Sequence, residues 1–169
     1  GVVYSNDTIQ RLARMKTAAS DFRLFWDNAY AVHHLTPERI EIENIDDACT
    51  RAGYPNRAFI FGSTSKVTFA GSGVGLFAGS ADNVAWFLKR MATQTIGGDK
   101  INQLRHLRLL KTTAGVHALM DRHREILAPK FRHVVDLFAE HLGPAGAATW
   151  TTPKGGYFIT LEAPHGTVR

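Results

Sequence analysis

The feature that most constrains the fold is the alternation of short apolar runs with helical patterns in the first hundred residues. Runs with strand character, each bounded by turn-forming residues, lie at 22–26, 58–61 and 74–79. Helical patterns that begin near a polar capping residue cover 6–15, 44–52 and 80–93. Strands that alternate with helices predict an α/β fold, in which a sheet is layered with helices.

One long helical pattern over 99–142 follows. Apolar residues recur there at steps of three and four, and Gly115 and Pro129 are expected to interrupt or bend the helix. Two short strands joined by a hairpin-type turn are expected next, at 148–150 and 157–161. This pattern predicts a change of domain near residue 99.

Composition excludes several classes of protein. The 169 residues are 44% apolar and 21% charged, which suits one domain or a large piece of one and excludes disordered, collagen-like and coiled-coil chains. The single cysteine, Cys49, excludes an intramolecular disulfide framework and a cysteine-based zinc site. No apolar run approaches the roughly 20 residues that span a bilayer, and no signal peptide is visible, so we expect a cytoplasmic protein without membrane partners. A start at Gly1 without methionine, and an end at Arg169 without a closing element, suggest a fragment.

The net charge of +5 comes from one stretch. Residues 100–134 hold eight Lys and Arg against two acidic residues, a net of +6. Apart from Phe131, no aromatic residues are interleaved with these charges in the manner of a nucleic-acid site. We therefore interpret the stretch as a solvated helix face and expect no nucleic-acid partner.

Side chains that suit one particular ligand follow two of the predicted strands. Lys66 comes directly after a buried strand, where partial desolvation would lower its pKa and make the amine a nucleophile. The hydroxyls of Ser63 and Ser65, with nearby backbone N–H groups, are suited to phosphate oxygens. Asp27 ends another buried strand, and Tyr30 follows three residues later. A ligand that used all these side chains would offer a carbonyl to the lysine, a protonated ring nitrogen to the aspartate, a phenolate oxygen to the tyrosine and a phosphate to the serines. Pyridoxal phosphate carries all four groups.

Three motifs resemble the fold-type-I pyridoxal-phosphate aminotransferases, and most of all a divergent aspartate-aminotransferase-like subgroup. They are Asp-Asn-Ala-Tyr at 27–30, Ser-Thr-Ser-Lys at 63–66 before a glycine-rich segment, and Pro-Lys-Gly-Gly-Tyr-Phe at 153–158. The resemblance covers nearly the whole chain. It implies that 1–98 is part of the cofactor-binding large domain, a mixed sheet layered with helices. It also implies that 99–142 is an interdomain helical segment and that 143–169 begins a small C-terminal α+β domain.

The resemblance also implies a role for each matching residue. Lys66 would form the internal aldimine with pyridoxal 5′-phosphate and then carry the proton in the 1,3-shift. Asp27 would keep the pyridine nitrogen protonated, and Tyr30 would hydrogen-bond the phenolic oxygen. The hydroxyls expected at the phosphate are those of Ser63, Ser65 and Ser72.

One departure concerns the phosphate. Family members usually carry a phosphate-binding arginine about eight residues after the lysine, whereas 70–74 contains none. Ser72, backbone N–H groups or another chain would take its place. The family's substrate-binding arginine would lie beyond Arg169.

Simpler interpretations compete with this one. Lys66 alone would be a lysine in a polar turn, and Ser63 to Lys66 also matches the Ser-x-x-Lys motif of penicillin-binding enzymes, whose companion motifs are missing. The glycines at 71–75 precede a strand, which disfavours a dinucleotide site. The eight histidines lack metal-ligand spacing, so we expect no metal and interpret them as surface or boundary residues.

The sequence therefore predicts an aminotransferase that acts on amino acids and 2-oxo acids. An aspartate-like amino acid is the first substrate to expect, and the intact protein is expected to be a homodimer with shared active sites. Two alternatives stay open. One is a non-catalytic effector domain of a transcriptional regulator on the same fold, and the other is a pyridoxal-phosphate lyase. Fold resemblance alone does not choose among them.

Overall fold

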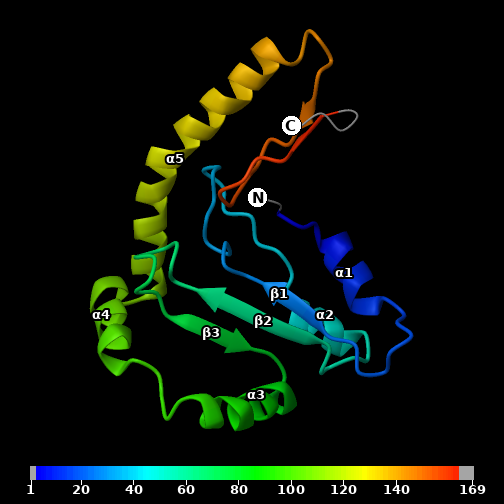
Figure 1. Ribbon diagram of the computed structural model, residues 1–169, viewed down its shortest axis with the longest axis vertical. Coiled ribbons are helices and arrows are strands. Elements are labelled where there is room, and N and C mark those ends of the chain that lie inside the picture. Colours follow the sequence, from blue (N-terminus) through cyan, green and yellow to red (C-terminus); the bar gives the residue numbers. More distant parts are fainter. Residues whose placement is uncertain (1–2, 164–169) are drawn as a thin grey trace. The chain divides into compact units, whose positions relative to one another are not determined.

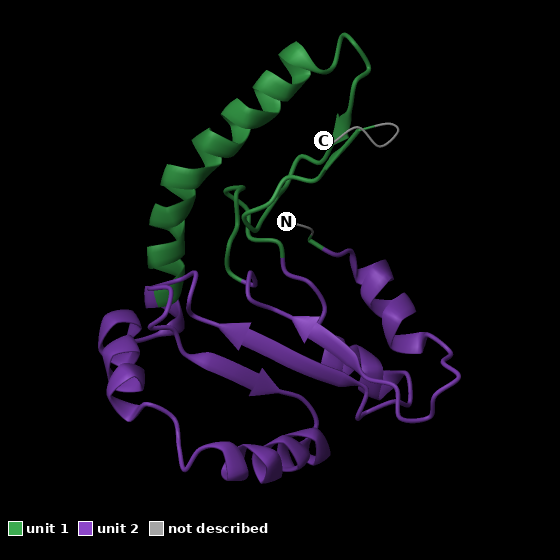
Figure 2. Cartoon of the chain, in the orientation of Figure 1, with its two compact units in different colours: residues 1–3, 32–40, 116–169 green, residues 4–31, 41–115 purple. Residues whose placement is uncertain are grey.

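The computed structural model describes residues 3–163 and divides into two compact units. Unit 2 comprises 4–31 and 41–115, and unit 1 comprises 32–40 with the chain from Val116 onwards (Figure 2). All the residues predicted to bind the cofactor belong to unit 2. The predicted change of domain near residue 99 stays a prediction.

A three-stranded sheet is the centre of unit 2 (Figure 1). Its strands, in the order β1-β2-β3, are Leu24–Asp27, Ala58–Ser63 and Gly75–Ala78. β1 pairs with β2 in parallel, and β2 pairs with β3 in antiparallel fashion, so the predicted mixed sheet is present. The parallel register sets Asp27 opposite Phe61, which brings the carboxyl ends of β1 and β2 to one edge.

Helices α1 (Asn6–Arg14) and α2 (Ile45–Arg51) bury one face of this sheet. The predicted helix start is confirmed for α1, because the Ser5 side chain accepts a hydrogen bond from the Thr8 N–H at 3.1 Å. Leu24 and Trp26 of β1 pack against the core that the two helices form with the start of β2. The buried members of that core are Ile9, Ala13, Ile45, Ala48, Cys49 and Ala58.

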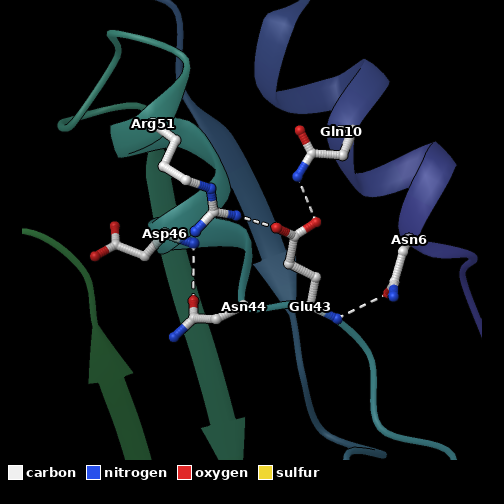
Figure 3. Close-up of polar contacts among 6 residues, drawn as sticks. All are labelled: Asn6, Gln10, Glu43, Asn44, Asp46 and Arg51. Atoms are coloured by element: carbon white, nitrogen blue, oxygen red, sulfur yellow. Dashed lines mark hydrogen bonds and ion pairs between the residues drawn. The ribbon is translucent and has the colours of Figure 1, made fainter.

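Polar contacts through Glu43 join α1 to α2 (Figure 3). The Glu43 carboxylate accepts from Gln10 of α1 and forms an ion pair with Arg51 of α2. The Glu43 backbone N–H donates to Asn6 Oδ1 at 2.9 Å. Asn44 then caps α2 by accepting from the Asp46 N–H at 2.9 Å. The two helices are thus held together by polar contacts as well as by the core.

Aromatic rings cover the opposite face of the sheet, where α3 (Ala81–Gln94) packs. The rings in contact come from Phe25, Phe59, Phe61, Phe77, Trp86 and Phe87. The prediction that β1 is a fully buried strand is wrong, because Phe25 is 72% exposed. β1 is buried on the Leu24 and Trp26 face alone, since alternate strand residues point to opposite faces.

The predicted long helix is two helices, α4 (Lys100–Leu110) and α5 (Thr113–His141). The break lies at Lys111, which has a positive φ of 59°, and not at Gly115. Thr112 Oγ1 accepts from the Gly115 N–H at 3.2 Å, so a side chain restarts the helix. Pro129 lies inside α5. Within residues 3–163, none of the helices is both long and apolar enough to cross a bilayer.

In the described part of unit 1, β4 (Thr149–Trp150) pairs with β5 (Leu161–Glu162) in antiparallel fashion, and His34 and Gly155 form an isolated antiparallel bridge. The predicted strand at 157–161 is mostly wrong, because only its last residue belongs to β5. Backbone groups of the connecting segment pair elsewhere: Gly156 N–H donates to His33 O at 2.8 Å, and Leu35 N–H donates to Lys154 O at 2.9 Å. Because these backbone groups pair with residues 33–35, the strand pairing of the expected hairpin is limited to β4 and β5.

Candidate active site

Two strand ends bring the candidate residues to one edge of the unit 2 sheet. Asp27 is the last residue of β1, and Ser63 is the last residue of β2. The ladder continues past β1, because Asn28 N–H donates to Phe61 O at 2.7 Å. Ligands of α/β sheets bind outside the carboxyl ends of such strands.

Asp27 is exposed and organises the turn that follows it. Its Oδ1 accepts a hydrogen bond from the Ala29 N–H at 3.1 Å, an Asx-type contact that turns the chain towards Tyr30. Although the sequence predicts a buried strand up to this residue, the Asp27 side chain is exposed. Asp27 points from the same face of β1 as Phe25, and that end of the face is open among the described residues.

Lys66 and Tyr30 are brought together from different strand ends. The Lys66 Nζ lies 4.9 Å from the centroid of the Tyr30 ring, within the range of a cation–π contact. Lys66 sits in a single turn that Thr64 O closes, accepting from Val67 N–H and Thr68 N–H at 2.9 Å each. The Lys66 side chain is exposed, so the expected desolvation of its amine is not seen in this chain. The turn directs the lysine away from the core, whereas Val67 beside it is buried.

The hydroxyls of Ser63 and Ser65 form one polar group in front of Lys66. Ser63 Oγ donates to Ser65 Oγ at 2.8 Å and accepts from the Ser65 N–H at 3.0 Å. Both serines are half-buried. Ser65 Oγ keeps its own proton to donate, so the pair suits an anionic oxygen.

The glycine-rich segment packs directly against this serine turn. Val74 N–H donates to Thr64 Oγ1 at 2.8 Å, and Thr64 N–H donates to Val74 O at 3.0 Å. A Cβ atom on Gly73 would lie 2.8 Å from the Ser65 backbone, so only glycine permits this approach. Ser72, one residue earlier, is therefore held beside the serine turn.

Four residues that tie the site together were not singled out from the sequence: Thr64, Thr68, Asn102 and His106. His106 Nε2 lies 3.0 Å from Thr64 Oγ1 and 2.8 Å from Thr68 Oγ1. Asn102 Nδ2 donates to Ser72 O at 2.7 Å. The sequence offers one signal for Asn102 and His106: they are four residues apart and therefore lie on one face of a helix. Such spacing of polar residues is typical of any solvated helix.

The interpretation of the histidines as surface or boundary residues is confirmed for six of them, which are exposed or half-buried: His34, His106, His117, His123, His133 and His141. His165 lies outside the described residues. His33 is 3% exposed, so its interpretation as a surface or boundary residue is wrong. Its ring meets Tyr157 edge-on at 4.9 Å, within unit 1. Among residues 3–163, no group of three or more His, Cys, Asp or Glu is arranged to hold a metal ion.

The donor set fits pyridoxal phosphate. A primary amine, a phenol and two hydroxyls gather around one turn at the ends of β1 and β2, and a carboxylate ends the neighbouring strand. These are the groups that the cofactor's aldehyde, phenolic oxygen, phosphate and ring nitrogen require. Among residues 3–163, no arginine side chain forms a hydrogen bond with the Ser63–Ser65 turn, so the anion-binding groups described there are hydroxyl and N–H groups.

Comparison with known proteins agrees with this chemistry. The family model described as aspartate amino-transferase matches residues 1–169. A relative from Mycolicibacterium smegmatis, named as a candidate aminotransferase, is 52% identical over the whole chain, which covers 40% of that relative. The aspartate aminotransferase of Corynebacterium glutamicum is 46% identical over 99% of the chain, which covers 39% of it.

A solved structure has the same fold. The crystal structure of a candidate aminotransferase from Corynebacterium diphtheriae superposes with a TM-score of 0.94 at 44% identity, covering 99% of this chain and 41% of that one. The chain thus spans about 40% of the length of the curated relatives that it matches.

Proposed function

This chain belongs to the aspartate amino-transferase family, and from that membership we propose that it is part of a pyridoxal-phosphate-dependent aminotransferase. The proposed reaction moves an amino group from an amino acid to a 2-oxo acid. The observation that carries the proposal is the approach of Lys66 Nζ to the Tyr30 ring, 4.9 Å from its centroid, beside the strand ends. This contact brings an amine and a phenol, which follow different strands, to one place.

Each candidate residue has a defined task in this proposal. When bound, pyridoxal phosphate supplies an electron sink that makes the α-proton of an amino acid acidic. The Lys66 amine captures the cofactor covalently and then carries the proton that leaves the substrate's α-carbon. Asp27 keeps the cofactor's ring nitrogen protonated, and the Tyr30 hydroxyl donates to its phenolic oxygen. The phosphate is bound by Ser63, Ser65 and Ser72.

An acidic, aspartate-like substrate is the first expectation. It is supported by the name of the Corynebacterium glutamicum relative, which is 46% identical over nearly all of this chain. We further propose a homodimer with shared active sites, as the family resemblance implies, and a cytoplasmic location. The regulator and lyase alternatives are outcomes of the test below.

The test uses the full-length parent protein with added pyridoxal phosphate. Borohydride reduction followed by peptide mass mapping should place the pyridoxyl label on Lys66. Lys66→Ala should abolish both the label and the exchange of amino groups between aspartate and 2-oxoglutarate. Lys89→Ala, on the exposed side of α3, is the matched control and should retain both.

Three results would contradict the proposal. Label on another lysine would remove Lys66 from its role. Label on Lys66 with no turnover would favour the effector-domain alternative. Conversion of the amino acid to an elimination or decarboxylation product, without transfer to the 2-oxo acid, would favour the lyase.

A further inference from the structure

We propose that His106, assisted by Asn102, is a positioning residue that fixes the Lys66 turn for cofactor binding. The inference rests on the proposed function, since the turn matters because Lys66 captures the cofactor. It assigns a role to α4 that the motifs around Lys66 do not reveal. Neither side chain is placed in contact with the cofactor.

Helix α4 is attached to unit 2 mainly by polar contacts. None of its residues is buried, and Ile101 and Leu107 are 72% and 62% exposed. The half-buried positions, Asn102, His106 and Leu110, recur every fourth residue and therefore form one face. With so little apolar surface removed from water, hydrogen bonds from this face determine how α4 meets the turn.

The His106 ring connects both ends of the Lys66 turn. Its Nδ1 lies 2.9 Å from Asn102 O, and a carbonyl oxygen only accepts, so Nδ1 carries the proton. In the neutral ring Nε2 is then an acceptor. Thr64 Oγ1 already accepts from Val74 N–H at 2.8 Å, which leaves the Thr64 hydroxyl proton to donate to Nε2, 3.0 Å away. Thr68 Oγ1 lies 2.8 Å from the same nitrogen.

These two threonines flank the lysine symmetrically. Thr64 precedes Lys66 by two residues, and Thr68 follows it by two. Thr68 Oγ1 also lies 3.1 Å from Thr64 O, the same carbonyl that closes the turn, so its single hydroxyl proton is donated either to that carbonyl or to His106 Nε2. Contact with both side chains therefore holds the turn from its two ends, and the exposed Lys66 side chain takes its direction from that backbone.

Asn102 secures the second segment of the site from the same helix face. Its Nδ2 donates to Ser72 O at 2.7 Å and to Gly73 O at 3.3 Å. The serine turn and the glycine-rich segment are thus both anchored to one helix. The distance between Ser72 and the Ser63–Ser65 pair then depends on α4, so cofactor affinity should depend on it too.

The experiment measures cofactor binding by the full-length apoenzyme, with three substitutions in α4. His106→Leu removes both ring nitrogens, whereas His106→Gln keeps a polar atom near the position of Nε2. Arg105→Leu is the matched control, because Arg105 is exposed on another face of α4. We expect His106→Leu to raise the dissociation constant for pyridoxal phosphate about tenfold, the size expected from losing one or two net hydrogen bonds. His106→Gln should restore most of the affinity, and Arg105→Leu should leave it unchanged.

A spectroscopic readout separates positioning from simple loss of stability. The absorbance of the holoenzyme against pH gives the pKa of the Lys66–cofactor linkage, which should differ between His106→Leu and wild type at saturating cofactor. Thr68→Val, which removes the other hydroxyl partner at nearly constant volume, should weaken binding as well. In the double variant the two effects should fall short of additive, because both remove the same contact. Thr68→Val alone provides the test if His106→Leu does not fold.

These experiments distinguish failure of the proposed function from failure of the positioning role of His106. If wild-type protein is not labelled at Lys66 after borohydride reduction, the proposed function fails and this inference with it. If Lys66 is labelled but His106→Leu and Thr68→Val match Arg105→Leu in cofactor affinity and in the pKa of the linkage, the positioning role is overturned while the proposed function stands.

Discussion

Gly73 and Ser65 approach so closely that a Cβ atom on Gly73 would lie 2.3 Å from Ser65 Oγ and 2.8 Å from Ser65 Cα. Any side chain at position 73 must therefore displace the backbone that precedes Lys66. This contact explains why position 73 is occupied by glycine.

Gly73→Ala should destabilise the protein by about 1–3 kcal/mol, the usual cost of overpacking a close contact. Urea unfolding of the full-length protein measures this. Gly75→Ala is the control, since no atom lies within 4 Å of its added Cβ, and its stability should change by no more than about 0.5 kcal/mol. Equal effects of the two substitutions would show that the Gly73–Ser65 contact is unimportant.

The close contact at Gly73 also predicts how cofactor affinity changes when an arginine is placed at this position. Gly73→Arg should lower, not raise, the affinity for pyridoxal phosphate, because the clash with Ser65 outweighs the added charge. The measurement is the cofactor dissociation constant of the full-length apoenzyme. Tighter binding would mean that the segment moves away from the Ser65 backbone at little cost.

Asp27 should affect turnover through the charge of its carboxylate and not through the hydrogen bond that shapes the following turn. Asp27→Asn keeps an Oδ1 that accepts from the Ala29 N–H, which lies 3.1 Å away, but it loses the carboxylate. Asp27→Ala loses both. If Asp27 stabilises a protonated ring nitrogen, both variants should lower kcat by about a hundredfold or more. Wild-type turnover in Asp27→Asn would restrict the residue to its turn.

Asp46 should make stability depend on pH. Burial raises the pKa of its carboxyl above the ordinary value, and the charge of Asp47 raises it further. Its Oδ1 is buried without a hydrogen-bond partner among the described residues. The folded state thus binds this proton more tightly than the unfolded chain, so the stability it contributes is lost as pH rises through the raised pKa.

Asp46→Asn should consequently raise the unfolding temperature at pH 7, and the gain should shrink towards pH 3. Asp47→Asn, at an exposed position, is the control and should have the smaller effect at pH 7. Thermal unfolding across this pH range measures both. A gain that stays constant with pH would rule out titration of Asp46 as its source.

Cys49 should be inert in the native protein. It is 0% exposed, and burial raises the pKa of its thiol although Arg57 opposes that shift. Iodoacetamide at pH 8 should leave the peptide that contains Cys49 unmodified, and the same treatment in urea should modify it fully. Equal labelling in the two conditions would show that the core around α2 opens readily.

The sequence by itself determined the elements whose signals are local. Ser5 and Ser80 cap helices at the expected residues, because a capping side chain and its backbone partner are three residues apart. The strands of the sheet followed from apolar runs bounded by turns, and their mixed directions were implied by the family resemblance. The motifs around Asp27 and Lys66 identified the family, since they are contiguous strings of residues.

The tertiary structure alone decided what depends on distant partners. Thr64 and His106 are 42 residues apart, and no local pattern indicates their contact. The same holds for the pairing of His33 with Gly156, which shortened the predicted hairpin, and for the exposure of Asp27. Hydrogen bonds and burial of this kind depend on which segments meet in three dimensions, whereas capping and periodicity depend on neighbours along the chain.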